Sequence, residues 1–580
     1  MVLNSNSGMI LYEEFGMNEK KGQKDLHKIL MSIDEKDESA YRKITGCFAY
    51  DDFTLTVEYV PEKPGIRPSR LRVEMPLDTT KFPREILSTR SREIAARDFI
   101  VRKFDSKVES YSIFKRGVKG GRIAIDRPGQ ELLEISAVVV GDDSIEIRFI
   151  VDLPVKNRKV HSQTAVELFM KKVPLIVREC FVYENLNSEK LSDWIETNED
   201  ADVLRSMLVE NGLVAFIADG SILTRHSSTG LEEIVPFTSP EELAVTFDLP
   251  NRGKICGMGI PEGITLIIGG FSQGKTTLLR AIERGVYNHI SGDGRELAVT
   301  VPDAAAIRVE EGRKVENVDI SPLISQVSDK IDTRHFTSRS AFPATSFAAN
   351  IMEAIEIGTS LLLFDDETMV TGLVDRDARV QALIPKEEEQ ATPLVDLLPL
   401  LRDEHRISSI IVGGSGDYFE YADTVIAVRN YKVFAVTDEA KRIAREKSSG
   451  RVLENTGHFS FPAERSPITS SLEPVKMGEE YFPKPRGKGY IQYGDEFIDA
   501  TKVTQIVNQS QSRAIARGIA MVHRLMDGSK SLREAVYRVI DRVENVGLDT
   551  MSNRHMGDLA SFRALELAAA INRLKKLRIK

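Results

Sequence analysis

Residues 269–276 read GGFSQGKT and match the pattern GxxxxGK[ST] in full. In this pattern the glycines let backbone N–H groups wrap around phosphate oxygens, and the lysine meets the β- and γ-phosphates of a nucleotide. The hydroxyl of Thr276 is the expected ligand of Mg²⁺. We therefore predict a nucleotide-phosphate site formed by Gly269, Gly270, Phe271, Ser272, Gln273, Gly274, Lys275, Thr276 and Thr277.

A site of this kind also needs a carboxylate that holds the metal, usually at the end of a neighbouring buried strand. The stretch SLLLFDDET supplies one, because its apolar residues are followed directly by Asp365. An apolar run that ends in Asp is common by itself. Here it follows a complete P-loop and comes after the predicted helix ATSFAANIMEAIEIG, so we predict that Asp365 binds Mg²⁺ together with Thr276.

The elements around these residues predict the fold class. The P-loop follows the apolar strand ITLII and leads into the helix TTLLRAIERGV, and residues 237–445 continue as apolar strands followed by helices. Such an order is typical of a doubly wound α/β domain. We predict an α/β fold, with a P-loop core at residues 237–445 between an α+β N-terminal domain at residues 1–236 and a hairpin and mainly helical region at residues 446–580.

Individual segments of the flanking domains also have clear patterns. FTLTVEYV and RLRVEM predict strands, SREIAARDFIVRKF predicts a helix, and LLEISAVVVGDDSIEIRFIVDL predicts a hairpin. A second hairpin-like piece, GLVAFIADGSILTR, precedes the boundary near residue 236. After it, GKGYIQYGDEFIDA predicts a hairpin, and amphipathic helices follow to the end of the sequence.

Composition favours a soluble intracellular protein. The 580 residues lack an apolar run long enough for a membrane span, and the N-terminal residues lack the basic and apolar regions of a signal peptide. Cys47, Cys180 and Cys256 are too few and too widely spaced for a disulfide framework or a CxxC metal pair. These features predict a cytoplasmic location.

The charge is unevenly distributed. The whole chain has a net charge of -9, yet residues 61–130 contain 17 Lys and Arg against 9 Asp and Glu. Basic side chains beside glycines and aromatic rings can follow a nucleic-acid backbone, although charge runs are also common on solvated surfaces. The candidate nucleic-acid contacts are Arg67, Arg70, Arg72, Lys115, Arg116, Lys119 and Arg122.

Several longer segments carry a resemblance. GLVAFIADGSILTR, MGIPEGITLIIGG, GGSGDYFEYADTV, NQSQSRAIA and GDLASFRALELAAAINRL resemble a family of predicted ABC-class ATPases of bacteria and archaea. That family includes an RNA-editing-associated relative in trypanosomatid mitochondria, and the match runs from about residue 40 to the C-terminus. It implies a nucleotide-dependent ATPase without transporter domains. One P-loop and one incomplete signature loop per chain then predict a head-to-tail homodimer with two composite ATP sites.

The resemblance also implies roles for further residues. ABC proteins place Glu directly after the metal carboxylate, whereas this chain has the shorter Asp366 there, followed by Glu367, so both are candidate catalytic carboxylates. Where a histidine that senses the γ-phosphate is expected, the candidates are Ser415 or the backbone of residues 413–416, and Gln326 is the candidate lid-loop glutamine. The signature loop of ABC proteins usually consists of small residues, but this chain has Phe342 and Pro343 there. The following Thr345 and Ser346 are still expected to offer hydroxyl groups.

The prediction for function is an ABC-class ATPase that binds Mg²⁺·ATP as a homodimer, hydrolyses it slowly, and couples nucleotide state to the binding or remodelling of nucleic acid, with RNA as the leading candidate. The alternative is an ATP-gated dimeric scaffold for a protein partner, with little or no hydrolysis. A small-molecule kinase is a third possibility, which the cassette-like order of elements disfavours.

Overall fold

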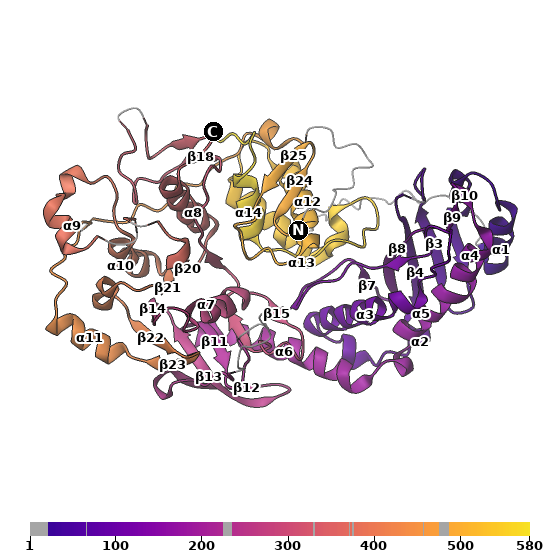
Figure 1. Cartoon of the computed structure of the whole chain (residues 1–580), viewed down its shortest axis with the longest axis horizontal. Coiled ribbons are helices and arrows are strands. Elements are labelled where there is room, and N and C mark those ends of the chain that lie inside the picture. Colours follow the sequence, from indigo (N-terminus) through magenta and orange to yellow (C-terminus); the bar gives the residue numbers. More distant parts are fainter. Residues whose placement is uncertain are drawn as a thin grey trace, which may run out of the picture. The chain divides into compact units, whose positions relative to one another are not determined.

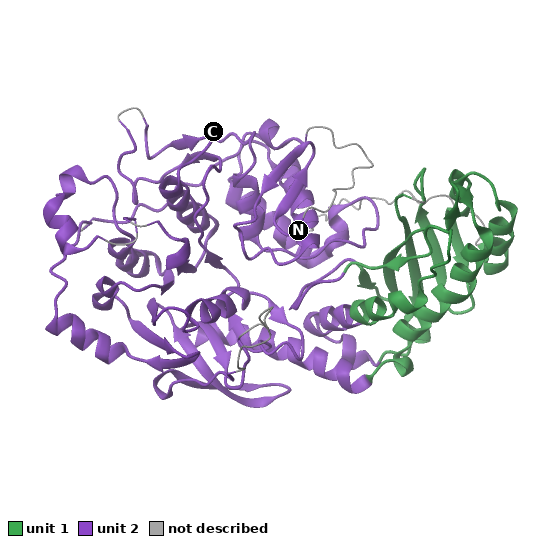
Figure 2. Cartoon of the chain, in the orientation of Figure 1, with its two compact units in different colours: residues 1–82, 100–126, 137–187 green, residues 83–99, 127–136, 188–580 purple. Residues whose placement is uncertain are grey.

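The computed structural model describes residues 21–580, apart from residues 65, 224–234, 329–330, 371, 374–375, 456 and 475–486. The chain divides into two compact units (Figure 2). Unit 1 comprises residues up to 82 together with residues 100–126 and 137–187, and unit 2 comprises residues 83–99, 127–136 and 188–580. The long helix α3 (Arg90–Tyr111) contributes residues to both.

Unit 1 is built around a seven-stranded sheet in the order β1-β2-β3-β4-β8-β5, with β7 also paired to β8. The alternating pattern of RLRVEM sends Leu71, Val73 and Met75 into the core, as expected for a strand with one buried face. The predicted strands, helix and hairpin of this region are confirmed. The elements are β1 (Lys21–Gly22), α1 (Gln23–Ser32), β2 (Gly46–Ala49), β3 (Thr54–Tyr59), β4 (Ser69–Pro76), α2 (Leu77–Thr80), β5 (Ile123–Ala124), β7 (Val138–Val140), β8 (Ser144–Val151), β9 (Val155–Lys156), β10 (Lys159–Val160), α4 (Ser162–Glu167) and α5 (Val173–Phe181).

Unit 2 contains the long helix α6 (Ser188–Glu210) and a four-stranded antiparallel sheet in the order β12-β13-β11-β16. Its strands are β11 (Leu213–Ala218), β12 (Ala244–Leu249), β13 (Gly253–Pro261) and β16 (Ala298–Thr300). The piece predicted as a hairpin at residues 212–225 lies within the described residues only up to 223, and there β11 pairs with β13 and β16 and not with the segment that follows it. The boundary predicted near residue 236 consequently falls inside unit 2, and the three-part division stays a prediction.

The core of unit 2 is a six-stranded sheet in the order β17-β20-β21-β14-β22-β23 (Figure 1). Every neighbouring pair is parallel except the last, in which β23 runs antiparallel to β22. Strands β17 (Ala304–Ala306), β20 (Leu361–Asp365), β21 (Ser408–Val412), β14 (Ile264–Ile268), β22 (Thr424–Arg429) and β23 (Lys432–Ala435) make up the sheet. The carboxyl ends of its central strands therefore meet at one edge, where α/β folds bind ligands.

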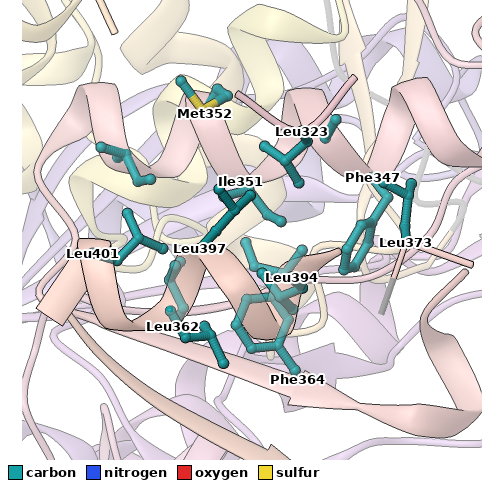
Figure 3. Close-up of a cluster of buried hydrophobic side chains, with 14 of the residues drawn as sticks. Leu323, Phe347, Ile351, Met352, Leu362, Phe364, Leu373, Leu394, Leu397 and Leu401 are labelled. Carbon is teal, nitrogen blue, oxygen red and sulfur yellow. The ribbon is translucent and has the colours of Figure 1, made fainter. Parts of the chain in front are cut away.

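Helices α8 (Pro343–Ile357) and α10 (Leu394–His405) pack their apolar side chains against β20. In Figure 3, Phe347 and Ile351 of α8 and Leu394 of α10 lie with Phe364 of β20 in one buried cluster. Helix α7 (Lys275–Arg284) follows β14. The expected alternation of strands and helices is thus confirmed for this part of the chain.

The C-terminal region has its own core, formed by the predicted hairpin and helices. Its elements are β24 (Tyr490–Tyr493), β25 (Glu496–Asp499), α12 (Gln509–Leu525), α13 (Leu532–Val546) and α14 (Ala564–Asn572). Smaller elements of unit 2 are β6 (Glu131–Leu132), β15 (Asn288–His289), β18 (Val315–Val318), β19 (Phe336–Ser338), α9 (Ala378–Leu383) and α11 (Thr437–Glu446). Among the helices that the structure describes, none has the length and apolar character that a membrane span requires.

Candidate nucleotide-binding and catalytic site

The P-loop connects β14 to α7 and is closely packed at both ends. A Cβ atom on Gly269 would lie 2.3 Å from the carbonyl oxygen of Val428. Gly274 has a φ of 105°, and a Cβ atom there would lie 2.6 Å from the ring of Tyr431. Both positions therefore require glycine, because no side chain fits between the loop and the β22–β23 turn.

The loop leaves polar groups free for an anion. No side chain caps the N-terminus of α7, so the first backbone N–H groups of the helix lack the usual side-chain acceptor. Lys275 Nζ donates to the carbonyl oxygens of Gly269 and Gly270, at 3.0 and 3.1 Å, and is thereby held over the loop. Donors at a helix N-terminus beside a lysine suit phosphate oxygens.

Other residues of the predicted phosphate site have different surroundings. Gln273 fixes the neighbouring turn: its Oε1 accepts from the backbone N–H of Asn430 at 2.7 Å, and its carbonyl oxygen accepts from the N–H of Tyr431 at 2.9 Å. Ser272 has a φ of 59°, a left-handed conformation that shapes the loop. Phe271 is 93% exposed at the tip of the loop.

Asp365 ends β20 and is nearly inaccessible, with 3% of its surface exposed. Its Oδ1 is buried and has no hydrogen-bond partner among the described residues. Burial raises the pKa of this carboxyl, and the nearby positive charge of Arg308 opposes the shift. An orphaned buried carboxylate oxygen is costly unless a cation or donor meets it, so Asp365 fits the expected Mg²⁺ ligand.

A cavity of about 890 Å³ opens beside Asp365. Thr277 of α7 and Glu367 line it, whereas Asp366 is not part of its wall; Asp366 and Glu367 are both exposed. Asp366 and Glu367 both belong to the short turn Asp366–Thr368 that follows β20. The cavity wall consists of Gln130, Glu131, Thr277, Arg280, Glu283, Arg284, Arg295, Arg308, Val309, Asp365, Glu367, Thr368, Tyr431, Lys502 and Thr504.

Ser415 and Gln326 take up separate positions. Ser415 follows β21, whose carboxyl end is next to those of β14 and β20, and its Oγ accepts from the backbone N–H of Asp417 at 3.3 Å. Its hydroxyl therefore caps the short helix at residues 416–420. Gln326 is exposed, and the preceding Ser325 is bonded through its backbone N–H to the carbonyl oxygen of Gln390.

The hydroxyl groups of the signature loop are not presented at the surface as expected. Phe342 is 72% exposed at the N-terminus of α8. Thr345 and Ser346 are buried, and the Thr345 hydroxyl donates to the carbonyl oxygen of Phe342 at 3.1 Å. The expectation that these two residues present hydroxyl groups is wrong here, because the first turn of α8 packs them inward.

The basic residues of β4 are occupied by contacts within unit 1. Arg72 forms ion pairs with Glu58, Glu74 and Glu146 at distances of 3.2, 3.8 and 2.6 Å. The guanidinium carbon of Arg70 lies 5.1 Å from the centre of the Tyr59 ring. Arg67, just before the strand, is exposed.

A glycine loop at residues 115–122 carries the other basic candidates. Cβ atoms on Gly120 and Gly121 would lie 2.4 Å from the Leu153 carbonyl oxygen and 2.3 Å from the Ile113 carbonyl oxygen. The loop therefore packs directly against the protein backbone at these two residues. Its four cations are exposed, and one of them, Lys115, forms an ion pair with Glu167 at 2.7 Å. The four are Lys115, Arg116, Lys119 and Arg122.

Sequence reasoning missed several residues that the fold brings to the cavity. Arg308 follows β17 and lies beside Asp365, and Lys502 and Thr504 come from the C-terminal region. None of them belongs to a recognisable motif. The spacing of Arg280 and Arg284 from the P-loop threonines was a usable signal, because residues four apart share one face of a helix.

Family models match most of the chain. The model of the ABC_ATPase P-loop domain matches residues 187–465, the N-terminal model of the ATPases of the ABC class matches residues 23–184, and the MRB1590 C-terminal domain matches residues 483–580. A curated relative, the uncharacterised protein MJ1628 of Methanocaldococcus jannaschii, is 28% identical over 261 residues, which cover 43% of this chain and 54% of that protein. The matched segment thus spans about half of the relative's length.

Solved structures of ABC proteins also align with part of the chain. The structure of cbiO1 from Clostridium perfringens, part of the ABC transporter complex cbiONQ, has a TM-score of 0.24 and 16% identity and covers 40% of this chain and 94% of that one. The ADP conformation of MJ1267, an ATP-binding cassette of an ABC transporter, has a TM-score of 0.23 and 13% identity and covers 41% and 97%. Together, the P-loop geometry, the order of the core sheet and the family models establish that the chain belongs to the ABC class of P-loop ATPases, in the family that has an MRB1590-type C-terminal domain.

Proposed function

We propose that this chain binds and slowly hydrolyses Mg²⁺·ATP as a homodimer, and that it couples nucleotide state to the binding of nucleic acid, with single-stranded RNA as the leading ligand. The observation that carries the nucleotide part is the combination of an uncapped α7 N-terminus, Lys275 and the orphaned Oδ1 of Asp365. Lys275 and the α7 N–H groups would hold the phosphates, and Thr276 and Asp365 would hold Mg²⁺, which neutralises phosphate charge when bound.

The test of the nucleotide site is calorimetry with Mg²⁺·ATP on Lys275→Ala. Loss of a charge-assisted contact should weaken binding by about 1.5–3 kcal/mol, which corresponds to about 10- to 150-fold in Kd. Lys447→Ala, an exposed lysine after α11, is the matched control and should bind normally. If Lys275→Ala binds ATP like the wild type, the P-loop is not the nucleotide site.

The nucleic-acid part is supported by the glycine loop of unit 1. Arg116, Lys119 and Arg122 are exposed, and no ion pair to them is found among the described residues, but Arg122 lies near the Asp152 carboxyl and opposes the rise in its pKa that burial causes. Arg116 and Lys119 are therefore the charges most open to phosphates. Arg72 and Lys115 already face carboxylates, which makes them weaker candidates. The resemblance to an RNA-editing-associated relative favours RNA over DNA as the ligand.

Replacing Arg116, Lys119 and Arg122 together by Gln tests this loop. Each lost phosphate contact should reduce the slope of log affinity against log salt by about 0.7 for a single strand, while ATP binding stays intact. Replacing Lys441, Arg442 and Arg445 of α11 by Gln removes the same charge from unit 2 and is the control. Unchanged RNA affinity in the loop variant would contradict the role of this surface.

A second candidate function is an ATP-gated scaffold for a protein partner with negligible turnover. It is favoured by the short Asp366 after the metal carboxylate and by the exposed Phe342 at the signature loop, both of which depart from an efficient hydrolytic site. ATP-driven dimerisation without RNA binding and without hydrolysis, measured by light scattering and phosphate release, would support this function over the first.

A further inference from the structure

Arg308 is placed beside the metal carboxylate by the pairing of the core strands. In the parallel pair of β17 and β20, Ala306 lies opposite Leu363, so Arg308, two residues on, reaches the level of Asp365. The backbone continues this alignment: the N–H of Ile307 donates to the Leu363 oxygen at 3.0 Å, and the N–H of Val309 donates to the Thr368 oxygen at 3.1 Å. Arg308 is therefore fixed at the start of the turn that carries Glu367.

The side chain of Arg308 joins this turn to helix α7. Its Nη2 donates to Glu283 Oε2 at 2.8 Å, and its Nη1 donates to Thr368 Oγ1 at 3.3 Å. Thr368 Oγ1 in turn donates to the carbonyl oxygen of Asp365 at 3.1 Å. Arg308 is 8% exposed and Glu283 is 3% exposed, so water screens this ion pair only weakly.

Residues of the C-terminal region hold the other end of this arrangement. The Thr504 hydroxyl donates to Glu283 Oε1, the second oxygen of the carboxylate that binds Arg308. Gln505 Nε2 donates to the carbonyl oxygens of Glu283 and Ala304, both at 3.2 Å. Thr504 and Gln505 thereby contact both the helix and the strand on which Arg308 depends.

We infer that Arg308 is a positioning residue for ATP hydrolysis, and that Glu283 and Thr504 hold it in place, so that the C-terminal region sets the geometry of Asp365 and Glu367. The inference rests on the proposed function. A catalytic group displaced by about 1 Å can lose about 100-fold in rate, so a fixed turn at Asp366–Thr368 matters for turnover. Arg308 makes no described contact with the P-loop, so it should affect kcat and not nucleotide binding.

The first arm of the experiment compares Arg308→Gln and Arg308→Lys with the wild type in steady-state ATP hydrolysis by the full-length chain. Arg308→Gln should lower kcat by about 100-fold, with KM and the calorimetric Kd for ATP within about threefold of wild type. Arg308→Lys keeps the charge but loses the planar fork that reaches Glu283 and Thr368 together, so it should restore activity only partly. A rise in KM that accounts for the whole loss would overturn the inference.

The second arm uses conservative changes that leave the ion pair in place. Thr504→Val removes the hydroxyl that holds Glu283 and should lower kcat by about 3- to 10-fold, a loss on the scale of one neutral hydrogen bond. Thr501→Val is the matched control, because Thr501 is exposed and its hydroxyl bonds to Asp499. In the Arg308→Gln background Thr504→Val should have no further effect, since it acts through Arg308.

The outcomes separate this inference from the proposed function. If wild-type turnover is absent, or survives Lys275→Ala, the proposed hydrolysis fails, and the inference fails with it. If turnover is lost in Lys275→Ala but unchanged in Arg308→Gln, only the inference fails. Equal effects of Thr504→Val and Thr501→Val, or additive effects of Thr504→Val and Arg308→Gln, also overturn it, and the threonine pair decides the matter should Arg308→Gln not fold.

Discussion

At the scale of single residues, the two acidic positions after Asp365 differ in their surroundings. Glu367 lines the cavity together with Asp365 and Thr277, whereas Asp366 does not, although both side chains are exposed. We predict that Glu367→Gln lowers ATP turnover by about 100- to 10,000-fold, the usual contribution of a general base, and that Asp366→Asn has a smaller effect. Phosphate release at saturating ATP measures both.

If Asp366→Asn lowers turnover more than Glu367→Gln does, the general base is the residue directly after Asp365, as in other ABC proteins. Asp366→Glu would then raise turnover, because the longer side chain restores the usual reach. Nucleotide binding by both Asn and Gln variants is the control for an intact site.

The residues of this site were predictable to different extents. Lys275, Thr276 and Asp365 belong to motifs whose chemistry is local, so the sequence alone is enough to propose them as site residues. Arg308 could not be predicted, because its place beside Asp365 results from the pairing of β17 with β20, which lie about 60 residues apart in the sequence. The burial of Ser346 depends in the same way on how α8 packs.

At the scale of elements, helix α8 has a buried polar face. Glu353 pairs with Arg313 at 2.9 Å, and Glu356 pairs with Arg465 at 2.6 Å. These acids lie three residues apart, hence on one face of the helix, and both are less than 6% exposed. Helix α8 is therefore fixed to its surroundings by charge pairs as well as by the apolar cluster of Figure 3.

We predict that Arg313→Met alone destabilises the protein by about 3–5 kcal/mol, because it leaves Glu353 buried without its partner. The double variant Arg313→Met/Glu353→Leu should recover most of that loss, since apolar residues of similar size can replace a buried pair. Thermal unfolding of the two variants tests this. Equal destabilisation by both variants would show that the attraction between Arg313 and Glu353 exceeds the free energy lost when the two charges are buried.

The existence of α8 and β20 followed from local pattern, but their partners did not. The sequence AANIMEAIE predicts a helix from its periodicity, yet Arg313 and Arg465 come from distant segments. Strand β11 shows the same limit. Its own sequence predicts a strand, but its partners β13 and β16 come from residues 253–261 and 298–300. Because these partners lie beyond residue 236, the local pattern of β11 does not reveal that it belongs to the same unit.

At the scale of the whole molecule, the proposed coupling of ATP and RNA must be reciprocal. If Mg²⁺·ATP changes RNA affinity by some factor, RNA must change ATP affinity by the same factor, and such factors usually lie between about 5 and 150. We predict this equality, measured by fluorescence anisotropy for RNA and by calorimetry for ATP. Unequal factors would mean that the two assays report different assemblies.

Two variants serve as controls for this measurement. Lys275→Ala should abolish the effect of ATP on RNA while RNA binding remains. The triple change at Arg116, Lys119 and Arg122 should abolish the effect of RNA on ATP. If ATP and RNA affinities are independent in the wild type, the coupling is absent and the scaffold function gains support.

The contact of Gln505 with β17 has a practical consequence for dividing this chain into fragments. Strand β17 is at the edge of the core sheet, and Gln505 accepts from the Ala306 N–H at 3.1 Å and donates to the Ala304 oxygen, as a neighbouring strand would. A fragment that ends at residue 465 would leave this edge bare, and bare strand edges recruit strands from other molecules. We expect such an isolated cassette to aggregate in size-exclusion chromatography where the intact chain does not, so its loss of activity would say little about the missing region's role in catalysis.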